Sequence, residues 1–320
     1  MIKRIKKKFR YVILTSILNC KQFALKNTII ICSDPRGGST WLMEIFNALP
    51  YTIVNLEPLH VNSGVVSKKN KLGWFPYLPK EYSNLQFENL FFNILTLKIY
   101  NKWTTSFVSV KKILCAKIVV TKFVLANQLL PWLVDKFGDE LKFKPVYLVR
   151  HPITTCISQL KTFHNIKDKD LFKPLDNSEK FIVPKVIFNE RFKKHESYIN
   201  SLNTRLERQI AMWCINNANL IFNEYPCGWI IVFYEVTKLL KAINIDFNIE
   251  KLRNFNFKKP SHSNFNKDYQ DDANLQLESF FSKFSKEELL RIQNIFDYFN
   301  FTVYSAFEAY PRIDKELNVS

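Results

Sequence analysis

The sequence predicts an α/β fold, in which a central parallel sheet is flanked by helices and carries a P-loop-like phosphate-binding loop. Short apolar runs alternate with helical patterns, as expected of a parallel sheet covered on both faces. The chain has 320 residues, of which 47% are hydrophobic, so it can bury a sizeable core in a single domain. It contains only 6 glycines, and two of them are adjacent, at Gly37 and Gly38, between a strand pattern and a helix pattern.

The elements follow one another in a regular order. Strands are predicted at 28–33, 51–55, 116–122, 144–150 and 228–234. Helices are predicted at 39–49, 126–137, from Pro152 onward, 205–221 and 285–299, the last marked by a capping box of Ser285 and Glu288. The polar segment 165–182 is predicted to be a surface loop. We therefore expect a basic N-terminal segment, 1–27, and one α/β domain, 28–320.

The net charge is +17, and the first ten residues, MIKRIKKKFR, contain six basic side chains and no acidic one. Such a charge favours a polyanionic ligand: a nucleotide, an acidic glycan, a nucleic acid or an anionic membrane. The sequence has no motif that reads DNA or RNA, so we expect no nucleic-acid partner. The apolar run YVILTSILNC is too short to span a bilayer. We expect a cytoplasmic protein whose basic N-terminus either contacts a membrane surface or is a solvated tail.

Cysteine usage gives no sign of a disulfide framework or a metal site. The six cysteines form no C-x-x-C pair and no ligand spacing with the five histidines. Several lie in apolar runs, where buried free thiols are expected. We therefore expect a reducing compartment and no bound metal.

The segment TIIICSDPRGGSTWLMEIF, 28–46, has the layout of a phosphate-binding loop. A strand that runs through glycines into a helix directs backbone N–H groups and the helix dipole toward an anion. Arg36 adds a planar charged donor, Ser39 and Thr40 add hydroxyls, and Trp41 adds a ring face. The Lys-Ser or Lys-Thr that ends a nucleoside-triphosphate loop is missing. Taken alone, the pattern fits a tight turn with a solvated arginine equally well.

A second segment, YLVRHPITTCISQLK, ends a predicted strand at Arg150 and then opens a helix. Ser158 follows eight residues later, and Thr154 lies one turn before it on the same helix face. An arginine at a strand end and a serine on the next helix can hold a second phosphate. The alternative is an ordinary β–α turn whose arginine pairs with an acid.

Together the two segments resemble the sulfotransferases that use 3′-phosphoadenylyl sulfate (PAPS), and in particular the carbohydrate and bacterial members. YLVRHPITTCIS is similar to their 3′-phosphate motif, FNALPYTIVNLEPLHV to a Glu-Pro segment of carbohydrate sulfotransferases, and WIIVFYEVTKLL to a later strand end. The resemblance covers 28–240 and implies PAPS as co-substrate, 3′,5′-adenosine bisphosphate (PAP) as product and no metal. PRGGSTWL is similar to the family's 5′-phosphosulfate loop, which implies that Arg36, Gly37, Gly38, Ser39, Thr40 and Trp41 bind the co-substrate, with Arg150 and Ser158 on its 3′-phosphate.

The same resemblance implies catalytic roles. Arg36 would stabilise the leaving phosphate, and Lys122, at the end of a strand, would act on the sulfuryl side. The acceptor hydroxyl needs a base, and Glu57 and His60 are the two candidates; the resemblance favours Glu57.

The sequence departs from the family pattern in the 3′-phosphate motif and after Lys122. Ile153 stands where the motif commonly has a second arginine, and Phe and Val follow Lys122, so the histidine usual in cytosolic members is missing. In the basic segment NFKKPSHSNFN, the side chains of Lys258, Lys259 and Ser261 could reach the 3′-phosphate instead.

The expected function is transfer of a sulfuryl group from PAPS to a hydroxyl of a carbohydrate-type acceptor, so that the expected partner is a glycan. One alternative is a P-loop nucleotide kinase or phosphotransferase, which would need the missing lysine and a magnesium-binding acid. Another is a non-catalytic protein that binds anions or glycans. Substitution of Arg36 distinguishes the first and last, because it should abolish turnover but leave glycan binding nearly intact.

Overall fold

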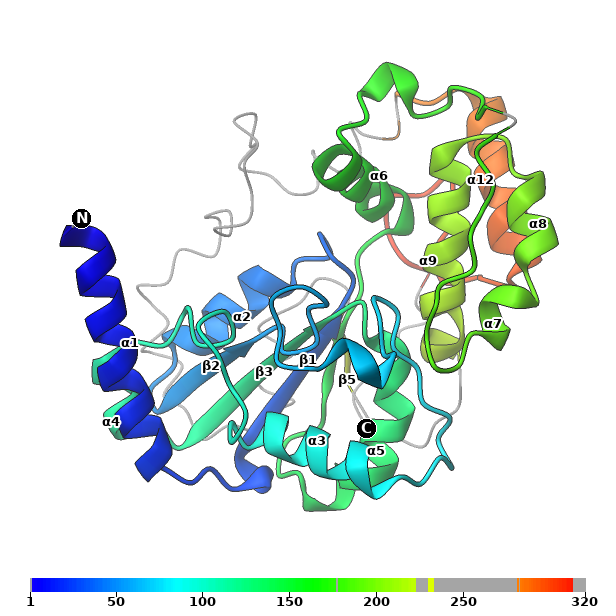
Figure 1. The fold of residues 1–320 in the computed structure, drawn as a ribbon. Coiled ribbons are helices and arrows are strands. Elements are labelled where there is room, and N and C mark those ends of the chain that lie inside the picture. The colour runs from blue at the N-terminus through cyan, green and yellow to red at the C-terminus, as the bar shows by residue number, and fades with distance from the viewer. Residues whose placement is uncertain (1, 177, 223–229, 233–280, 282, 313–320) are drawn as a thin grey trace.

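The structure is a computed structural model, and the description covers residues 2–176, 178–222, 230–232, 281 and 283–312. Its centre is a sheet with the strand order β2-β3-β1-β4-β5, in which every neighbouring pair is parallel (Figure 1). The strands are β1 (Thr28–Ser33), β2 (Thr52–Leu56), β3 (Ile118–Val124), β4 (Val146–Leu148) and β5 (Ile230–Val232). The predicted α/β class with a central parallel sheet is confirmed. β1 has the predicted bounds, β2 and β3 are shifted by one or two residues, and β4 is shorter than predicted. Of the predicted strand 228–234, the structure describes 230–232, which form β5.

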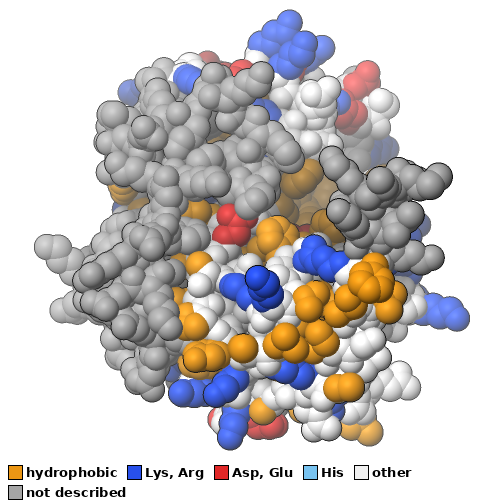
Figure 2. Space-filling view, turned by 90° about the vertical axis from the view of Figure 1, so that its left-hand side faces the viewer, with side chains coloured by type: hydrophobic (Ala, Val, Ile, Leu, Met, Phe, Trp, Pro, Cys, Tyr) orange, Lys and Arg blue, Asp and Glu red, His pale blue; other side chains and the backbone are white. Residues whose placement is uncertain are grey.

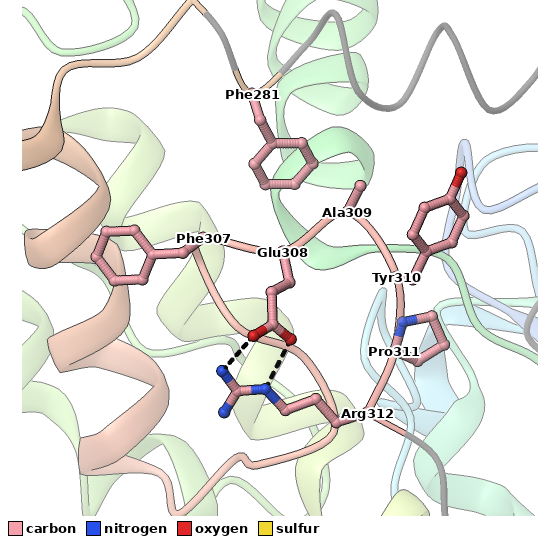
Figure 3. A pocket seen from close by; sticks show the side chains of 7 residues that line it. All are labelled: Phe281, Phe307, Glu308, Ala309, Tyr310, Pro311 and Arg312. Carbon is pink, nitrogen blue, oxygen red and sulfur yellow. Dashed lines mark hydrogen bonds and ion pairs between the residues drawn. The ribbon is translucent and has the colours of Figure 1, made fainter. Parts of the chain in front are cut away.

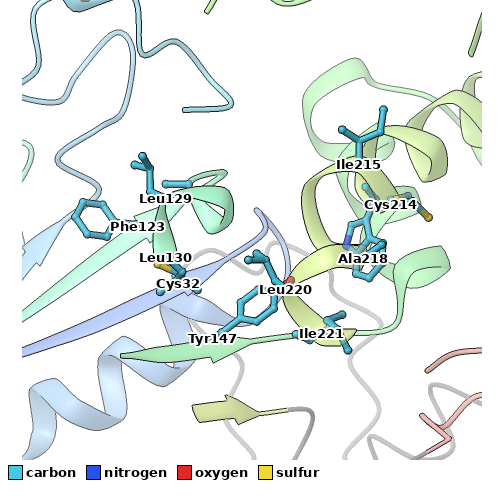
Figure 4. Packing of buried hydrophobic residues seen from close by; sticks show 14 of the residues in the cluster. Cys32, Phe123, Leu129, Leu130, Tyr147, Cys214, Ile215, Ala218, Leu220 and Ile221 are labelled. Atoms are coloured by element: carbon cyan, nitrogen blue, oxygen red, sulfur yellow. The ribbon is translucent and has the colours of Figure 1, made fainter. Parts of the chain in front are cut away.

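Successive side chains of a strand point to opposite faces of the sheet, and here each face is covered by a hydrophobic cluster. Ile29 and Ile31 of β1 pack with α2 (Ser39–Ala48), whereas Ile30 and Cys32 pack into a larger cluster on the other face. Figure 4 shows this larger cluster, in which residues of α9 (Arg205–Phe222) lie over Tyr147 of β4. An uninterrupted apolar run such as TIIIC is what a doubly covered strand requires.

The other helices lie around this core, and in Figure 1 several of them form a group at the right of the sheet. The predicted helices at 39–49, 205–221 and 285–299 are confirmed within one residue, including the Ser285–Glu288 capping box, and the helix from Pro152 is confirmed. The bounds not yet given are α1 (Ile2–Cys20), α3 (Leu85–Leu95), α4 (Val110–Cys115), α5 (Leu130–Phe137), α6 (Pro152–His164), α7 (Glu190–Lys193), α8 (Glu196–Ser201) and α12 (Lys286–Tyr298).

The N-terminal segment is more ordered than its charge alone indicates. Residues 2–20 form α1, which packs against α4, and Leu14 and Leu18 are buried in a small cluster with Ile53 of β2. The second half of α1 therefore belongs to the packed domain, whereas the choice between membrane contact and a solvated tail for the basic run before it stays open. In the part of the chain that the structure describes, no helix is long and apolar enough to cross a bilayer.

The strand order places a topological switch point between β1 and β4. The chain leaves β1 for α2 and β2 on one side of the sheet, and it leaves β4 for α6 and β5 on the other. In open α/β sheets, the crevice at the carboxyl ends of such a strand pair is the usual ligand site. The loops that follow β1 and β4 contain Arg36 and Arg150, so the fold brings both predicted motifs to this crevice.

Candidate functional site

The loop between β1 and α2 is tightly wound. The N–H of Gly37 donates to the carbonyl of Asp34 (3.0 Å), and a Cβ at Gly37 would lie 2.5 Å from the Ser33 hydroxyl. Gly38, the N-cap of α2, has φ 96°, and Arg36 has φ 65°. A left-handed backbone costs a non-glycine residue roughly 1–2 kcal/mol, and such strain often marks a functional site. The N-cap residue of α2 is Gly38, which has no side chain to accept from the first-turn N–H groups, so those N–H groups can serve an anion.

The two predicted phosphate motifs meet at Arg36. Its Nε donates to the Oγ of Ser158 on α6 at 3.0 Å, and Nη1 of Arg150 lies 3.4 Å from the Arg36 carbonyl. Burial lowers the pKa of Arg36. The pKa of Arg150 is also lowered, by loss of hydration and by the charge of Arg36; since the residue is exposed, the nearby charge is the cause that the geometry supports. Two guanidinium groups therefore repel each other in the crevice, and an anion bound there would relieve that repulsion.

Side chains of α6 and α9 hold the loop between β1 and α2 in place. Nε2 of Gln159 donates to the carbonyl of Pro35 at 2.8 Å, and Gln209 of α9 holds Gln159 in turn at 2.6 Å. Asp34 is buried, and its burial raises the pKa of the carboxyl group to about 7, although hydrogen bonds from the side chains of Asn217, Asn127 and Trp213 act in the opposite direction. Sequence reasoning missed Asp34 and Gln159. Their only signal is adjacency to the motifs, because the partners that give them a role lie on other elements, chiefly α9.

A second group of predicted residues meets beside the loop, at the carboxyl end of β3. Nζ of Lys122 lies 2.8 Å from Oε1 of Glu57 and 2.8 Å from the hydroxyl of Thr40. The Lys122 side chain is only 3% exposed and that of Glu57 is 19% exposed. Glu57 follows β2 directly, has φ 41°, and its N–H donates to the Lys122 carbonyl at 2.9 Å. The ammonium group thus links the helix that follows the loop to the candidate base.

The described partners of the His60 side chain are residues other than those of this ion pair. Its Nδ1 accepts hydrogen bonds from the backbone N–H groups of Asn62 (3.3 Å) and Ser63 (3.1 Å), so in the neutral ring the proton is on Nε2. The imidazole packs against Trp74 and Trp103. This arrangement gives His60 a structural task in its turn and supports the prediction that Glu57 is the base, which stays a prediction.

The structure explains the departure at Ile153. The Ile153 side chain is fully buried in the main hydrophobic cluster, so an arginine placed there would enter the core rather than the crevice. Thr154 and Ser158 lie one turn apart on α6, as predicted, but the Thr154 residue is buried and its hydroxyl donates to the His151 carbonyl at 3.0 Å. Trp41 packs against the apolar cluster beneath α2.

A pocket of about 560 Å³ lies next to the Arg150 motif (Figure 3). His151, which caps α6, donates from Nε2 to the carbonyls of Ser305 (3.3 Å) and Glu308 (3.1 Å), and its ring contacts Phe281. This volume is within the range of roughly 300–1,000 Å³ usual for ligand pockets. The pocket is lined by Phe281, Phe307, Glu308, Ala309, Tyr310, Pro311 and Arg312.

Some predicted residues lie outside the described part of the chain. These are Lys258, Lys259 and Ser261, together with most of the later strand-end motif around Tyr234 and Glu235. Among the described residues, no group of three or more His, Cys, Asp or Glu side chains could hold a metal ion. Cys32, Cys156 and Cys214 are buried free thiols, as predicted, whereas Cys20 and Cys115 are exposed.

The chain was also compared with known protein families, curated proteins and solved structures, and none of them matches it.

Proposed function

We propose that this protein is a PAPS-dependent sulfotransferase that transfers a sulfuryl group to a hydroxyl of a carbohydrate-type acceptor. The observation that carries the proposal is the convergence of two sequence motifs, far apart in the chain, at the switch point of the sheet, through the Arg36–Ser158 hydrogen bond and the Arg150–Arg36 contact. An isolated tight turn or a β–α turn with a solvated arginine would not require this meeting.

The residues at the crevice fit a nucleotide that carries two anionic ends. The loop N–H groups and Arg36 would hold the 5′-phosphate, because helix N-termini and guanidinium groups both favour dianions. Arg150 and Ser158 would hold the 3′-phosphate. The pocket beside His151 has room for the rest of the nucleoside. No lysine ends the loop, and a sulfuryl donor, unlike a nucleoside triphosphate with its magnesium ion, does not need one.

Bound PAPS would supply an activated sulfuryl group. Glu57 would accept the proton of the acceptor hydroxyl, and the ammonium of Lys122, 2.8 Å away, would hold its carboxylate in position. As the acceptor oxygen bonds to sulfur, the bond from sulfur to the phosphate oxygen breaks. Arg36 and the loop N–H groups would stabilise the charge that develops on this phosphate oxygen, and one well-placed donor of this kind contributes about 2.7–4 kcal/mol. Such transfers depend mainly on positioning and charge.

The test is calorimetric titration of the full chain with PAP and, separately, with ATP and magnesium. We expect PAP to bind at micromolar or lower concentration and Arg150→Ala to weaken this binding at least tenfold. Arg205→Ala is the matched control, because Arg205 pairs with Glu179 on the surface of α9. A preference for magnesium-ATP would favour the kinase alternative. Turnover that is unaffected by Arg36→Ala would contradict the role of Arg36 in stabilising the leaving phosphate.

A further inference from the structure

We propose that Trp74, His60 and Trp103 form an aromatic platform that binds a sugar ring of the acceptor. His60 lies in the chain turn that begins at the candidate base, Glu57. The proposal rests on the proposed function for the nature of the acceptor, and it adds the residues that bind it. None of the sequence motifs includes either tryptophan.

The three rings form one cluster at the surface. The His60 ring centroid lies 4.9 Å from that of Trp74, edge to face, and 5.2 Å from that of Trp103, with the planes tilted by 52°. Trp74 is 43% exposed and Trp103 is 37% exposed, although tryptophan usually buries most of its surface. Clustered exposed aromatic rings of this kind mark interaction sites.

The platform is fixed rigidly to the Glu57 turn. The N–H of His60 donates to the Glu57 carbonyl at 3.0 Å, and the backbone then winds so tightly that a Cβ at Gly64 would lie 2.3 Å from the Pro58 carbonyl. Since the His60 ring is held by hydrogen bonds within this turn, its position follows that of Glu57. The His60 ring therefore belongs to the turn that begins at Glu57, whose carboxylate pairs with Lys122.

Asn101 ties the third ring to the same turn. Its Nδ2 donates to the carbonyls of Ser63 and Gly64, both at 2.9 Å, and its Oδ1 accepts from the N–H of Trp103 at 2.9 Å. A chance surface contact would not need a half-buried amide to join two loops so far apart in sequence. These bonds fix the backbone of Trp103 relative to the His60 turn, and such preorganisation lowers the cost of binding.

A sugar ring is the occupant that fits these properties. One face of a pyranose presents C–H groups that pack against aromatic rings, and its rim presents hydroxyls for hydrogen bonds. Binding sites for small ligands combine such apolar surfaces with a few polar groups. The platform follows the candidate base Glu57 in the same turn, and the net charge of +17 favours an acidic glycan.

The experiment uses the full chain saturated with PAP and titrated with three hexasaccharides: a heparin fragment, a chondroitin fragment and chitohexaose. We expect at least one to bind, and we expect Trp74→Ala and Trp103→Ala each to weaken this binding at least tenfold without changing PAP affinity. Trp74→Phe should restore most of the loss. The matched control is Tyr51→Ala, since Tyr51 is 49% exposed but lies at the opposite end of β2 from Glu57.

Two outcomes would overturn the platform: binding that both alanine variants retain within twofold, or no binding of any of the three hexasaccharides to the wild-type chain. PAP titration separates this result from the proposed function. PAP binding without tryptophan-dependent sugar binding removes only the platform. Tryptophan-dependent sugar binding without PAP binding supports the platform and removes the sulfotransferase.

Discussion

The ion pair between Lys122 and Glu57 makes a prediction about stability that does not depend on the function. Its atoms are 2.8 Å apart, and the ammonium side is much more buried than the carboxylate side, at 3% against 19% exposure. Glu57→Gln leaves the ammonium in the interior with only neutral acceptors. Lys122→Met leaves a carboxylate that can still reach water. The two substitutions should therefore differ in cost although they break the same pair.

Removing one partner of a buried pair costs about 3–5 kcal/mol, and we expect Glu57→Gln to fall in this range because the ammonium cannot be hydrated. For Lys122→Met we expect roughly 1–3 kcal/mol, the cost of leaving a partly hydrated acceptor unpaired. The double variant should be more stable than the sum of the two losses predicts, by roughly 1–3 kcal/mol, as for residues in direct contact.

The assay is urea unfolding of the four proteins of this double-mutant cycle, followed by circular dichroism and tryptophan fluorescence. Thr40→Ala in the same series serves as a control, because it removes one hydrogen bond of Lys122 but no charge. Additive losses, with a coupling below about 0.5 kcal/mol, would refute the reasoning, since contact between the two side chains would then contribute nothing. A larger cost for Lys122→Met than for Glu57→Gln would refute the burial argument.

Three further predictions concern pH, the loop and the N-terminus. Burial lowers the pKa of His151 to about 4, so as the pH falls from about 6.5 toward 4 the unfolded chain binds a proton that the folded chain does not, and stability should fall by up to about 3 kcal/mol. Asp34, with its pKa raised to about 7, changes stability in the opposite direction over this pH range. The effect of His151 is therefore measured as the difference in stability between wild type and His151→Asn, a variant that keeps an N-cap side chain. A difference that does not vary with pH would contradict the prediction. Gly37→Ala should distort the loop, because its Cβ would lie 2.5 Å from the Ser33 hydroxyl, and it should weaken PAP binding at least tenfold in calorimetry. Gly138→Ala is the control, since its Cβ would meet only the end of a valine side chain, at 3.2 Å. Equal PAP affinities of the two variants would contradict the prediction. Finally, we propose that α1 binds anionic membranes, because its sequence begins with the basic run IKRIKKKFR and Phe9 is 66% exposed. Figure 2 shows the side of the molecule on which α1 and α4 lie, where basic and hydrophobic side chains occur together. The full chain should co-sediment with phosphatidylserine vesicles but not with phosphatidylcholine vesicles, and salt should reverse the binding; equal binding to both lipids would contradict it.

Most of the fold could be predicted from the sequence, because the signals are local. Apolar runs such as 28–33 are long and uninterrupted, glycine and proline mark their ends, and helix starts such as Ser285 carry their own caps, so strand and helix positions needed no knowledge of the rest of the chain. The helix α1 was not predicted. Its first half is strongly basic, and the reason for the apolar residues Leu14 and Leu18 in its second half is seen only where they pack in the cluster with α4.

The residue types of the candidate site could be predicted from the sequence, whereas their contacts could not. The residue types at Arg36, Glu57, Lys122 and Arg150 could be read from the chain because each stands at or near the end of an apolar strand, where parallel sheets present their side chains to ligands. Only the tertiary structure decided that Lys122 contacts Glu57 and Thr40 and that Arg36 contacts Ser158, since these partners come from different elements and their distances depend on strand order. It likewise separated His60 from Glu57, although they are three residues apart, because a tight turn directs one side chain toward Lys122 and the other toward two tryptophans. A sequence specifies which groups are available, whereas the packing of the elements that carry them determines which groups meet.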